Sequence, residues 1–281
     1  MKWTDSGTSA DVEDRRGAGG TGLKVGLGGT IVLGLLSVVF GRNLFNDLGV
    51  SPSTQSGAAQ HAPAQDSPEQ KKEVGFVSFV LDDVQKTWAR ELPKAGKQYR
   101  NAKMVLFTDS VQSGCGNAQA AMGPFYCPQD EKVYIDLGFY NQLKTRFGAP
   151  GDFAQAYVIA HEVGHHVQNV LGIEGKMRAA QQSNPRARNE LSVRLELQAD
   201  CFAGIWSHST EQRKILDPGD VDEAMNAASA VGDDRIQKQG RGQVNPETWT
   251  HGSSSQRMTW FKRGYQSGNI ADCDTFASDA P

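Results

Sequence analysis

Cysteine is scarce in this sequence, and its arrangement limits the chemistry. The 281 residues include four cysteines, and no two of them form a C-x-x-C pair. Zinc sites made of thiolates usually contain such pairs, so a cysteine zinc site is not expected. A surplus of charge is also lacking, because the formal net charge is only −3. Nothing in this balance favours nucleic acid as a partner.

Long hydrophobic runs are missing except for one near the amino terminus. It carries no charged side chain between Lys24 and Arg42. We interpret residues 25–41 as a transmembrane signal-anchor, at the short end of the range of about 17–25 residues that spans a bilayer. A cleaved signal peptide is disfavoured because no small-x-small cleavage site follows Phe40. A buried helix of a soluble domain is disfavoured by the four glycines between Val25 and Phe40.

Charges beside the hydrophobic run predict its orientation. Arg15, Arg16 and Lys24 precede it, and only Arg42 follows it closely. The positive-inside rule then places residues 1–24 in the cytoplasm and the rest of the chain outside it. Small residues recur every four positions in the run, at 26, 30 and 34. Such a stripe would allow weak self-association of two anchors.

The remaining chain divides into a linker and one domain. Residues 42–73 are rich in Pro, Ser, Ala and Gln, which cannot bury a core, so we expect a disordered linker. Residues 74–281 have the length of a single domain. Helical periodicity dominates there, while residues 103–107 and 132–137 have the pattern of strands. We therefore predict an α+β fold, mostly helical with a small sheet, preceded by a mobile tail at residues 1–24.

Metal chemistry is indicated by the segment His161-Glu162-Val163-Gly164-His165. It lies in a predicted helix that begins at Asp152, the expected N-cap, and stops at Gly172. Histidines four residues apart share one helix face, so both imidazoles can bind one metal ion. In this H-E-x-x-H pattern Glu162 is the general base for a zinc-bound water. The alternative is a solvated helix face, but the apolar residues before His161 favour burial.

A second helix pattern, at residues 189–206, offers a third metal ligand. Glu196 and Asp200 are four residues apart within it and share a face. Glu196 completes a His₂Glu set that leaves the fourth position of a zinc ion open. Asp200 is placed to accept the free ring N–H of a ligating histidine. Glu190 is the rival third ligand, but no acidic residue follows it one turn later.

The HExxH and ExxxD motifs together resemble those of the gluzincin class of zinc peptidases. More closely, the sequence resembles a bacterial family of membrane-anchored proteins described as "putative neutral zinc metallopeptidase". This resemblance implies a gluzincin-like domain, one Zn²⁺ ion, a protein or peptide substrate, and a place in the bacterial inner membrane with the domain on the periplasmic or extracellular side. It covers nearly the whole chain apart from residues 43–72, in segments at 1–7, 12–17, 114–116, 122–127, 133–136, around His161, 195–204 and 249–254.

The four cysteines are expected to form disulfides in a domain that lies outside the cytoplasm. Four cysteines allow three pairings, and we favour Cys115 with Cys127 and Cys201 with Cys273. The first bond would brace a glycine-rich loop, and the second would tie the C-terminal segment to the second metal helix. The alternative for Cys201 is a small buried apolar residue without a bond.

The segment Thr250-His251-Gly252-Ser253 begins the last predicted helix. Together with Arg257, it is similar to the segment after the third ligand in membrane-associated, CAAX-protease-like zinc peptidases. That resemblance implies that His251 or Arg257 stabilises the oxyanion formed at the scissile carbonyl. The alternative roles, a capping histidine and a surface arginine, stay equally open.

Together these patterns predict a membrane-anchored zinc metallopeptidase that hydrolyses peptide bonds. The rival, from another class, is a non-catalytic, zinc-stabilised module that binds envelope proteins. Glu162 argues against this rival, because a structural zinc site needs no general base and usually has protein ligands in all four positions.

Overall fold

The computed structural model describes residues 1–17 and 66–277. Residues 1–15 and the chain from residue 66 onward form one compact unit. The predicted signal-anchor at residues 25–41 and most of the predicted linker lie outside the described residues. Within the part that is described, no helix has both the length and the apolar character needed to cross a bilayer.

Helices make up most of this unit. The first long helix, α3, begins six residues earlier than the predicted domain, because Ser67 and Gln70 form a capping box at its start. The prediction of a disordered linker is therefore wrong for residues 68–73. The helices are α3 (Pro68–Glu91), α4 (Gly138–Thr145), α5 (Asp152–Leu171), α6 (Ile173–Ser183), α7 (Arg188–Gln212), α8 (Asp220–Ala230), α9 (Asp233–Arg241) and α10 (Ser254–Ser267).

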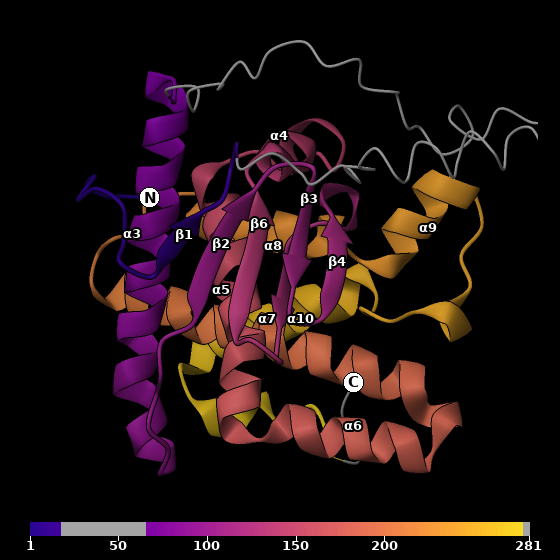
Figure 1. Cartoon of the computed structure of the whole chain (residues 1–281). Helices are drawn as coiled ribbons and strands as arrows, with labels where there is room; N and C mark the ends of the chain where they lie inside the picture. Colours follow the sequence, from indigo (N-terminus) through magenta and orange to yellow (C-terminus); the bar gives the residue numbers. More distant parts are fainter. Residues whose placement is uncertain (18–65, 278–281) are drawn as a thin grey trace, which may run out of the picture. The chain divides into compact units, whose positions relative to one another are not determined.

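The strands form a small sheet and a separate hairpin. The sheet has the order β1-β2-β6-β5, with β1 (Val12–Asp14), β2 (Lys103–Phe107), β6 (Lys132–Asp136) and β5 (Phe125–Cys127). Neighbours are parallel except β5, which runs antiparallel to β6. The hairpin pairs β3 (Ser110–Ser113) with β4 (Gly116–Gln119). Figure 1 shows the strands in front of α5, α7, α8 and α10. The mostly helical α+β class is confirmed.

The first residues of the chain belong to this unit. Strand β1 supplies one edge of the sheet, and the ring of Trp3 packs edge-on against Phe76 of α3 with centroids 5.3 Å apart. The amino group of Met1 lies 2.9 Å from the carboxylate of Asp152. The prediction of a mobile tail is therefore wrong for residues 1–15, because they bury apolar side chains and complete the sheet. Asp152 is not an N-cap either, because Gly151 occupies that position.

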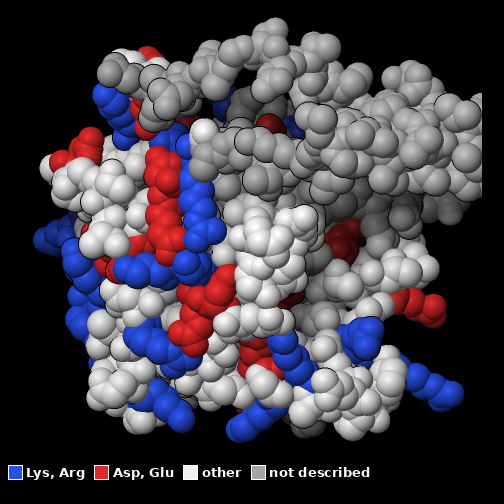
Figure 2. Space-filling model, viewed as in Figure 1, with Lys and Arg blue, Asp and Glu red and all other residues white. Residues whose placement is uncertain are grey.

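Charged side chains of both signs lie interspersed on the face shown in Figure 2. Two ion pairs connect the amino-terminal segment with neighbouring strands of the sheet. The Nζ atom of Lys103 lies 2.6 Å from Asp11, and that of Lys132 lies 2.6 Å from Glu13. These pairs add polar contacts to the backbone pairing of β1.

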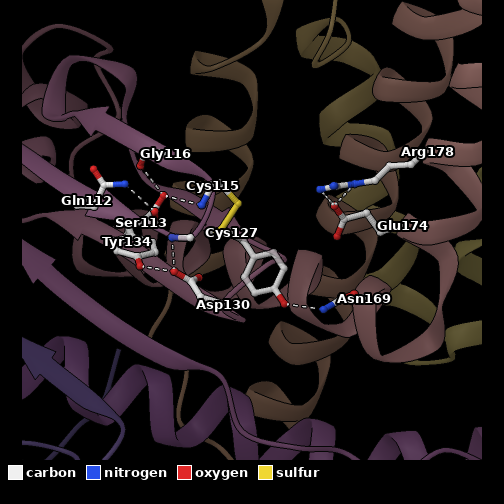
Figure 3. Close-up of a disulfide and its surroundings, with 12 residues drawn as sticks. Gln112, Ser113, Cys115, Gly116, Cys127, Asp130, Tyr134, Asn169, Glu174 and Arg178 are labelled. Carbon is white, nitrogen blue, oxygen red and sulfur yellow. Dashed lines mark hydrogen bonds and ion pairs between the residues drawn. A yellow bond between two sulfur atoms is a disulfide. The ribbon is translucent and has the colours of Figure 1, made fainter.

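Both predicted disulfides are present. Cys115, in the turn of the β3–β4 hairpin, is bonded to Cys127 at the end of β5 (Figure 3). Cys201 on α7 is bonded to Cys273 in the short 3₁₀ helix η5 (Ile270–Cys273). The first bond therefore braces the hairpin against the sheet, and the second holds the C-terminal segment on α7.

Candidate metal centre

A close helix crossing brings the predicted ligands together. His161 and His165 lie on α5, which packs against α7 at Gly164. A Cβ atom at this position would lie 3.0 Å from the backbone oxygen of Ala199. A side chain at position 164 would therefore require the backbone of α7 to shift by a few tenths of an ångström. The crossing places Glu196, on α7, opposite the two histidines.

The three predicted ligands converge on one point. Glu196 Oε2 lies 3.1 Å from His161 Nε2, and its Oε1 lies 3.5 Å from His165 Nε2. The three candidate ligand atoms all lie within 4.8 Å of one another. A tetrahedral zinc ion with ligands at about 2.0–2.1 Å separates its ligand atoms by roughly 3.3 Å. The spacing and the His₂Glu chemistry therefore fit Zn²⁺, and Glu190, which is exposed and paired with Arg194, is not a ligand.

Asp200 is the partner of the first histidine, as predicted. Its Oδ1 accepts a hydrogen bond from His161 Nδ1 at 2.8 Å, which leaves Nε2 to face Glu196. Tyr157, one turn before His161, donates its hydroxyl to the same carboxylate oxygen. Sequence reasoning missed Tyr157, although its position four residues before His161 places it on the ligand face of α5.

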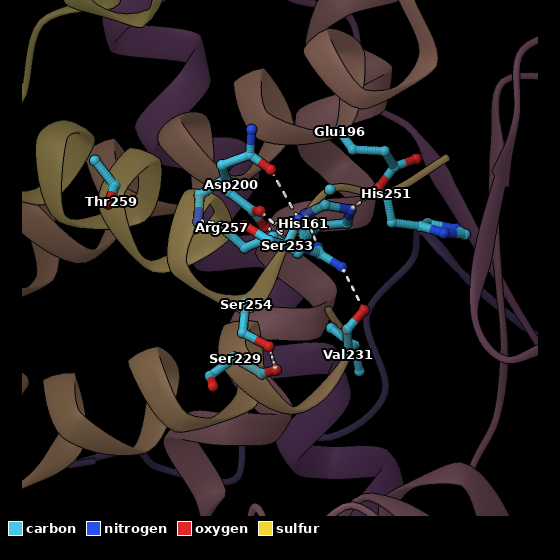
Figure 4. A network of polar contacts seen from close by, with 12 residues as sticks. His161, Glu196, Asp200, Ser229, Val231, His251, Ser253, Ser254, Arg257 and Thr259 are labelled. Carbon is cyan, nitrogen blue, oxygen red and sulfur yellow. Dashed lines mark hydrogen bonds and ion pairs between the residues drawn. The ribbon is translucent and has the colours of Figure 1, made fainter. Parts of the chain in front are cut away.

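Arg257 lies behind the ligands rather than at the open side. It is buried, and its Nε and Nη2 donate to the two oxygens of Asp200 at 2.8 and 2.9 Å. Figure 4 shows this pair on the far side of His161 from His251. The predicted oxyanion or substrate role for Arg257 is therefore wrong, because Asp200 engages its guanidinium. The alternative of a surface arginine is also wrong, because the side chain is buried.

Electrostatics at the site favour a bound cation. Burial alone would lower the pKa of His161, but Asp200 and Glu196 outweigh burial and raise this pKa to about 9. Burial would raise the pKa of Glu196, yet His165 and His161 hold it well below its usual range. The carboxylates thus stabilise positive charge at the point where the imidazoles meet.

Glu162 lies beside the ligands with its carboxylate nearly buried. Burial raises the pKa of this carboxyl, and the neighbouring histidines oppose the rise only in part. Among the described residues, no hydrogen bond to its side chain is found. A carboxylate with a raised pKa and no partner is suited to take up a proton.

His251 lies at the exposed side of the site. Figure 4 shows it next to Glu196, and its side chain is 49% exposed. Asp233 fixes the loop that carries His251, because its Oδ2 accepts hydrogen bonds from the backbone N–H groups of Thr250, His251 and Gly252 at 2.7–3.1 Å. The hydrogen bond between His251 Nδ1 and Asp233 also raises the pKa of the imidazole. Sequence reasoning missed Asp233, because the two segments are joined only by the fold.

The edge of the sheet nearest the metal helix is β5 rather than β6. Strand β6 has β2 on one side and β5 on the other, so neither of its edges is open to a substrate backbone. Tyr126 of β5 contacts His166 of α5, with its hydroxyl 2.9 Å from Nδ1. His166 also donates from Nε2 to the backbone oxygen of Arg100 at 2.7 Å. His166 therefore fastens the outer strand to the helix that carries the ligands.

The family model described as "Putative neutral zinc metallopeptidase" matches residues 1–276. The chain belongs to this family. It is 47% identical over 287 residues to the uncharacterized protein YpfJ of Escherichia coli K12, covering 98% of this chain and 99% of that protein. It is 46% identical over 208 residues to the uncharacterized protein Rv2575 of Mycobacterium tuberculosis H37Rv, covering 70% of this chain and 68% of that protein. No solved structure matches the chain. Membership in this family implies that the protein binds zinc and supports a peptidase activity.

Proposed function

We propose that this protein is a zinc-dependent peptidase that hydrolyses peptide bonds at a single Zn²⁺ ion held by His161, His165 and Glu196. The observation that carries the proposal is the convergence of these three side chains at distances suited to zinc. Each imidazole presents Nε2 to the site, and a buried partner engages each Nδ1. Partners of this kind are typical of histidines that bind metals.

When bound, Zn²⁺ supplies the Lewis acidity that activates a water molecule and polarises the scissile carbonyl. Glu162 takes a proton from the attacking water and then delivers it to the leaving amine. His251 donates from Nε2 to the oxyanion in its doubly protonated form, which the hydrogen bond from Nδ1 to Asp233 favours by raising the pKa of the imidazole. Asp200 and Arg257 do not touch the substrate but hold the ligand His161 in place.

The substrate backbone binds along the outer edge of β5 in this proposal. β5 is the outermost strand, next to the metal helix, and one of its two edges pairs with β6. Free backbone groups at the edge of a sheet can pair with an extended peptide. The contact of Tyr126 with His166 would keep this edge at a fixed distance from the ligands.

The test is hydrolysis of an unfolded protein by the purified full-length chain, before and after removal of metal with a chelator. We expect cleavage that the chelator abolishes and that about one equivalent of Zn²⁺ restores, because the site holds one ion. The full chain is required, since a fragment that starts at residue 74 would lack β1 and the first turn of α3. Chelator-induced unfolding without any cleavage would contradict the peptidase and support the non-catalytic module.

A further inference from the structure

The side-chain amide of Gln168 lies between the two helices that carry the ligands. Gln168 is on α5, three residues after His165, and its Oε1 is 2.9 Å from His165 Nδ1. Its Nε2 donates to the backbone oxygen of Leu195 at 2.7 Å, on α7 directly before Glu196. The residue is fully buried. One side chain thus contacts one ligand and the backbone next to another.

Backbone carbonyls set the direction of these hydrogen bonds. Gln168 Nε2 also donates to Gln198 Oε1 at 3.1 Å, and Gln198 Nε2 donates to the backbone oxygen of Cys273 at 2.9 Å. A carbonyl oxygen only accepts, so both NH₂ groups must face the backbone and the Oε1 of Gln168 must face His165. His165 Nδ1 therefore carries the proton, and its Nε2 keeps a lone pair toward Glu196.

We propose that Gln168 is a positioning residue for His165, oriented through Gln198 by the backbone carbonyl of the disulfide-bonded Cys273. This inference rests on the proposed function, because it takes His165 to be a zinc ligand. The two ligating histidines then have different support. Asp200 supplies charge to His161, whereas the neutral amide of Gln168 fixes the tautomer and ring orientation of His165 without adding charge. The disulfide to α7 makes the C-terminal segment part of this support.

The test is the zinc affinity of Gln168→Leu in the full-length chain, measured by competition with a chromophoric chelator. We expect the Kd for zinc to rise about 10–100-fold, as when the partner of a ligating histidine is lost. Gln198→Leu should raise the Kd less, because it removes only the hydrogen bond that orients Gln168 and leaves the contact of Gln168 with His165. The matched control is Gln85→Leu, which removes another buried glutamine, one that contacts Asp11 and Tyr99. This control should lower Tm and leave the Kd unchanged.

The proposal is wrong if folded Gln168→Leu binds zinc as tightly as the wild type. If circular dichroism shows that Gln168→Leu is unfolded, the zinc Kd of Gln198→Leu is the deciding measurement. A Kd of Gln198→Leu equal to that of the wild type then overturns the proposal. A wild-type chain that binds no zinc contradicts the proposed function itself, so the two failures are distinguishable.

A second inference comes independently from the amino-terminal segment, residues 1–15. Backbone hydrogen bonds join it to distant parts of the domain, with Lys2 N donating to Ile215 O and Arg15 N to Leu106 O, both at 2.8 Å. Between these two points, β1 pairs in parallel with β2, and Trp3 packs against α3. The family model also begins at residue 1. The segment is thus built into the same fold as the metal site.

We infer that residues 1–15 and residues 66–277 lie in the same cellular compartment. A chain that crossed a bilayer once between residues 15 and 66 would place β1 and β2 on opposite sides. The pairing of these strands and the burial of Met1 would then be lost. The orientation predicted from Arg15, Arg16 and Lys24 separates the two segments, so it conflicts with this fold.

The test uses two single-cysteine additions at exposed serines, Ser6→Cys in the amino-terminal segment and Ser183→Cys at the end of α6. The four native cysteines are all in disulfides, so each new thiol is the one available for labelling. Intact cells expressing the full chain are treated with a membrane-impermeant maleimide. We expect both cysteines to be labelled or both to be protected. Labelling of one without the other overturns the inference.

Discussion

Glu162→Gln is expected to lower kcat for peptide hydrolysis by roughly 10²–10⁴-fold, the contribution typical of a positioned general base. The amide keeps the size of the side chain but cannot accept a proton. Because Glu162 is not among the three convergent ligand atoms, the zinc Kd should stay near that of the wild type. The measurements are steady-state hydrolysis of an unfolded protein and zinc competition on the same preparation.

Glu190→Gln is the matched control for this substitution. Glu190 is also a glutamate of a metal-site helix, but its side chain is 65% exposed and pairs with Arg194. Its replacement should change neither kcat nor the zinc Kd. Full hydrolysis by Glu162→Gln would show that Glu162 is not the base, and equal losses in both variants would point to an effect unrelated to proton transfer.

Arg257→Met is expected to lower the free energy of unfolding by about 3–5 kcal/mol, the cost of breaking a buried ion pair by removing one partner. The carboxylate of Asp200 has no solvent exposure, and Arg257 donates two hydrogen bonds to it. Methionine would leave that charge buried with only His161 and Tyr157 as partners. Urea denaturation of the zinc-free chain measures the change.

The effect of Arg257→Met should also depend on pH. Burial alone would raise the pKa of Asp200, but Arg257 and His161 outweigh it and lower this pKa below the ordinary value of 3.8. A depressed pKa contributes stability that is present above the unfolded pKa and lost as the pH falls through the folded one. The difference in free energy of unfolding between the wild type and Arg257→Met should therefore be constant near neutral pH. It should shrink only when the pH falls below the pKa that Asp200 has in the unfolded chain.

Lys94→Met is the control for the ion pair. Lys94 pairs with Glu91 at 2.7 Å, and its side chain is 69% exposed. Exposed pairs contribute about 0–1 kcal/mol, so this variant should unfold almost as the wild type does. Equal losses for Arg257→Met and Lys94→Met would contradict the assignment of Arg257 to a buried pair.

The parts of the site that follow from local geometry were predictable. His161 and His165 are four residues apart, and so are Glu196 and Asp200, so the helical repeat alone gives each pair a common face. The strands at residues 103–107 and 132–136 were predictable for the same reason, since alternation and apolar runs are local patterns. Gly172 ends α5 with positive φ, as its position predicted.

Contacts between distant segments were not predictable from these patterns. Strand order in the sheet depends on which backbone edges meet in space, so the outer position of β5 and the pairing of β1 with β2 have no local signal. Asp152 was misassigned because its carboxylate contacts the amino group of Met1, which is remote in sequence. Arg257 was misassigned because the burial of a charged side chain depends on a partner elsewhere in the chain.

Residue type and local periodicity were enough to give the donor set and its helical spacing, whereas the four cysteines still allowed three pairings. The tertiary structure decided that Arg257 supports Asp200, that Gln168 joins His165 to the C-terminal disulfide, and that residues 1–15 complete the sheet. The physical reason is that hydrogen bonds and burial of these groups are satisfied only when distant segments pack together.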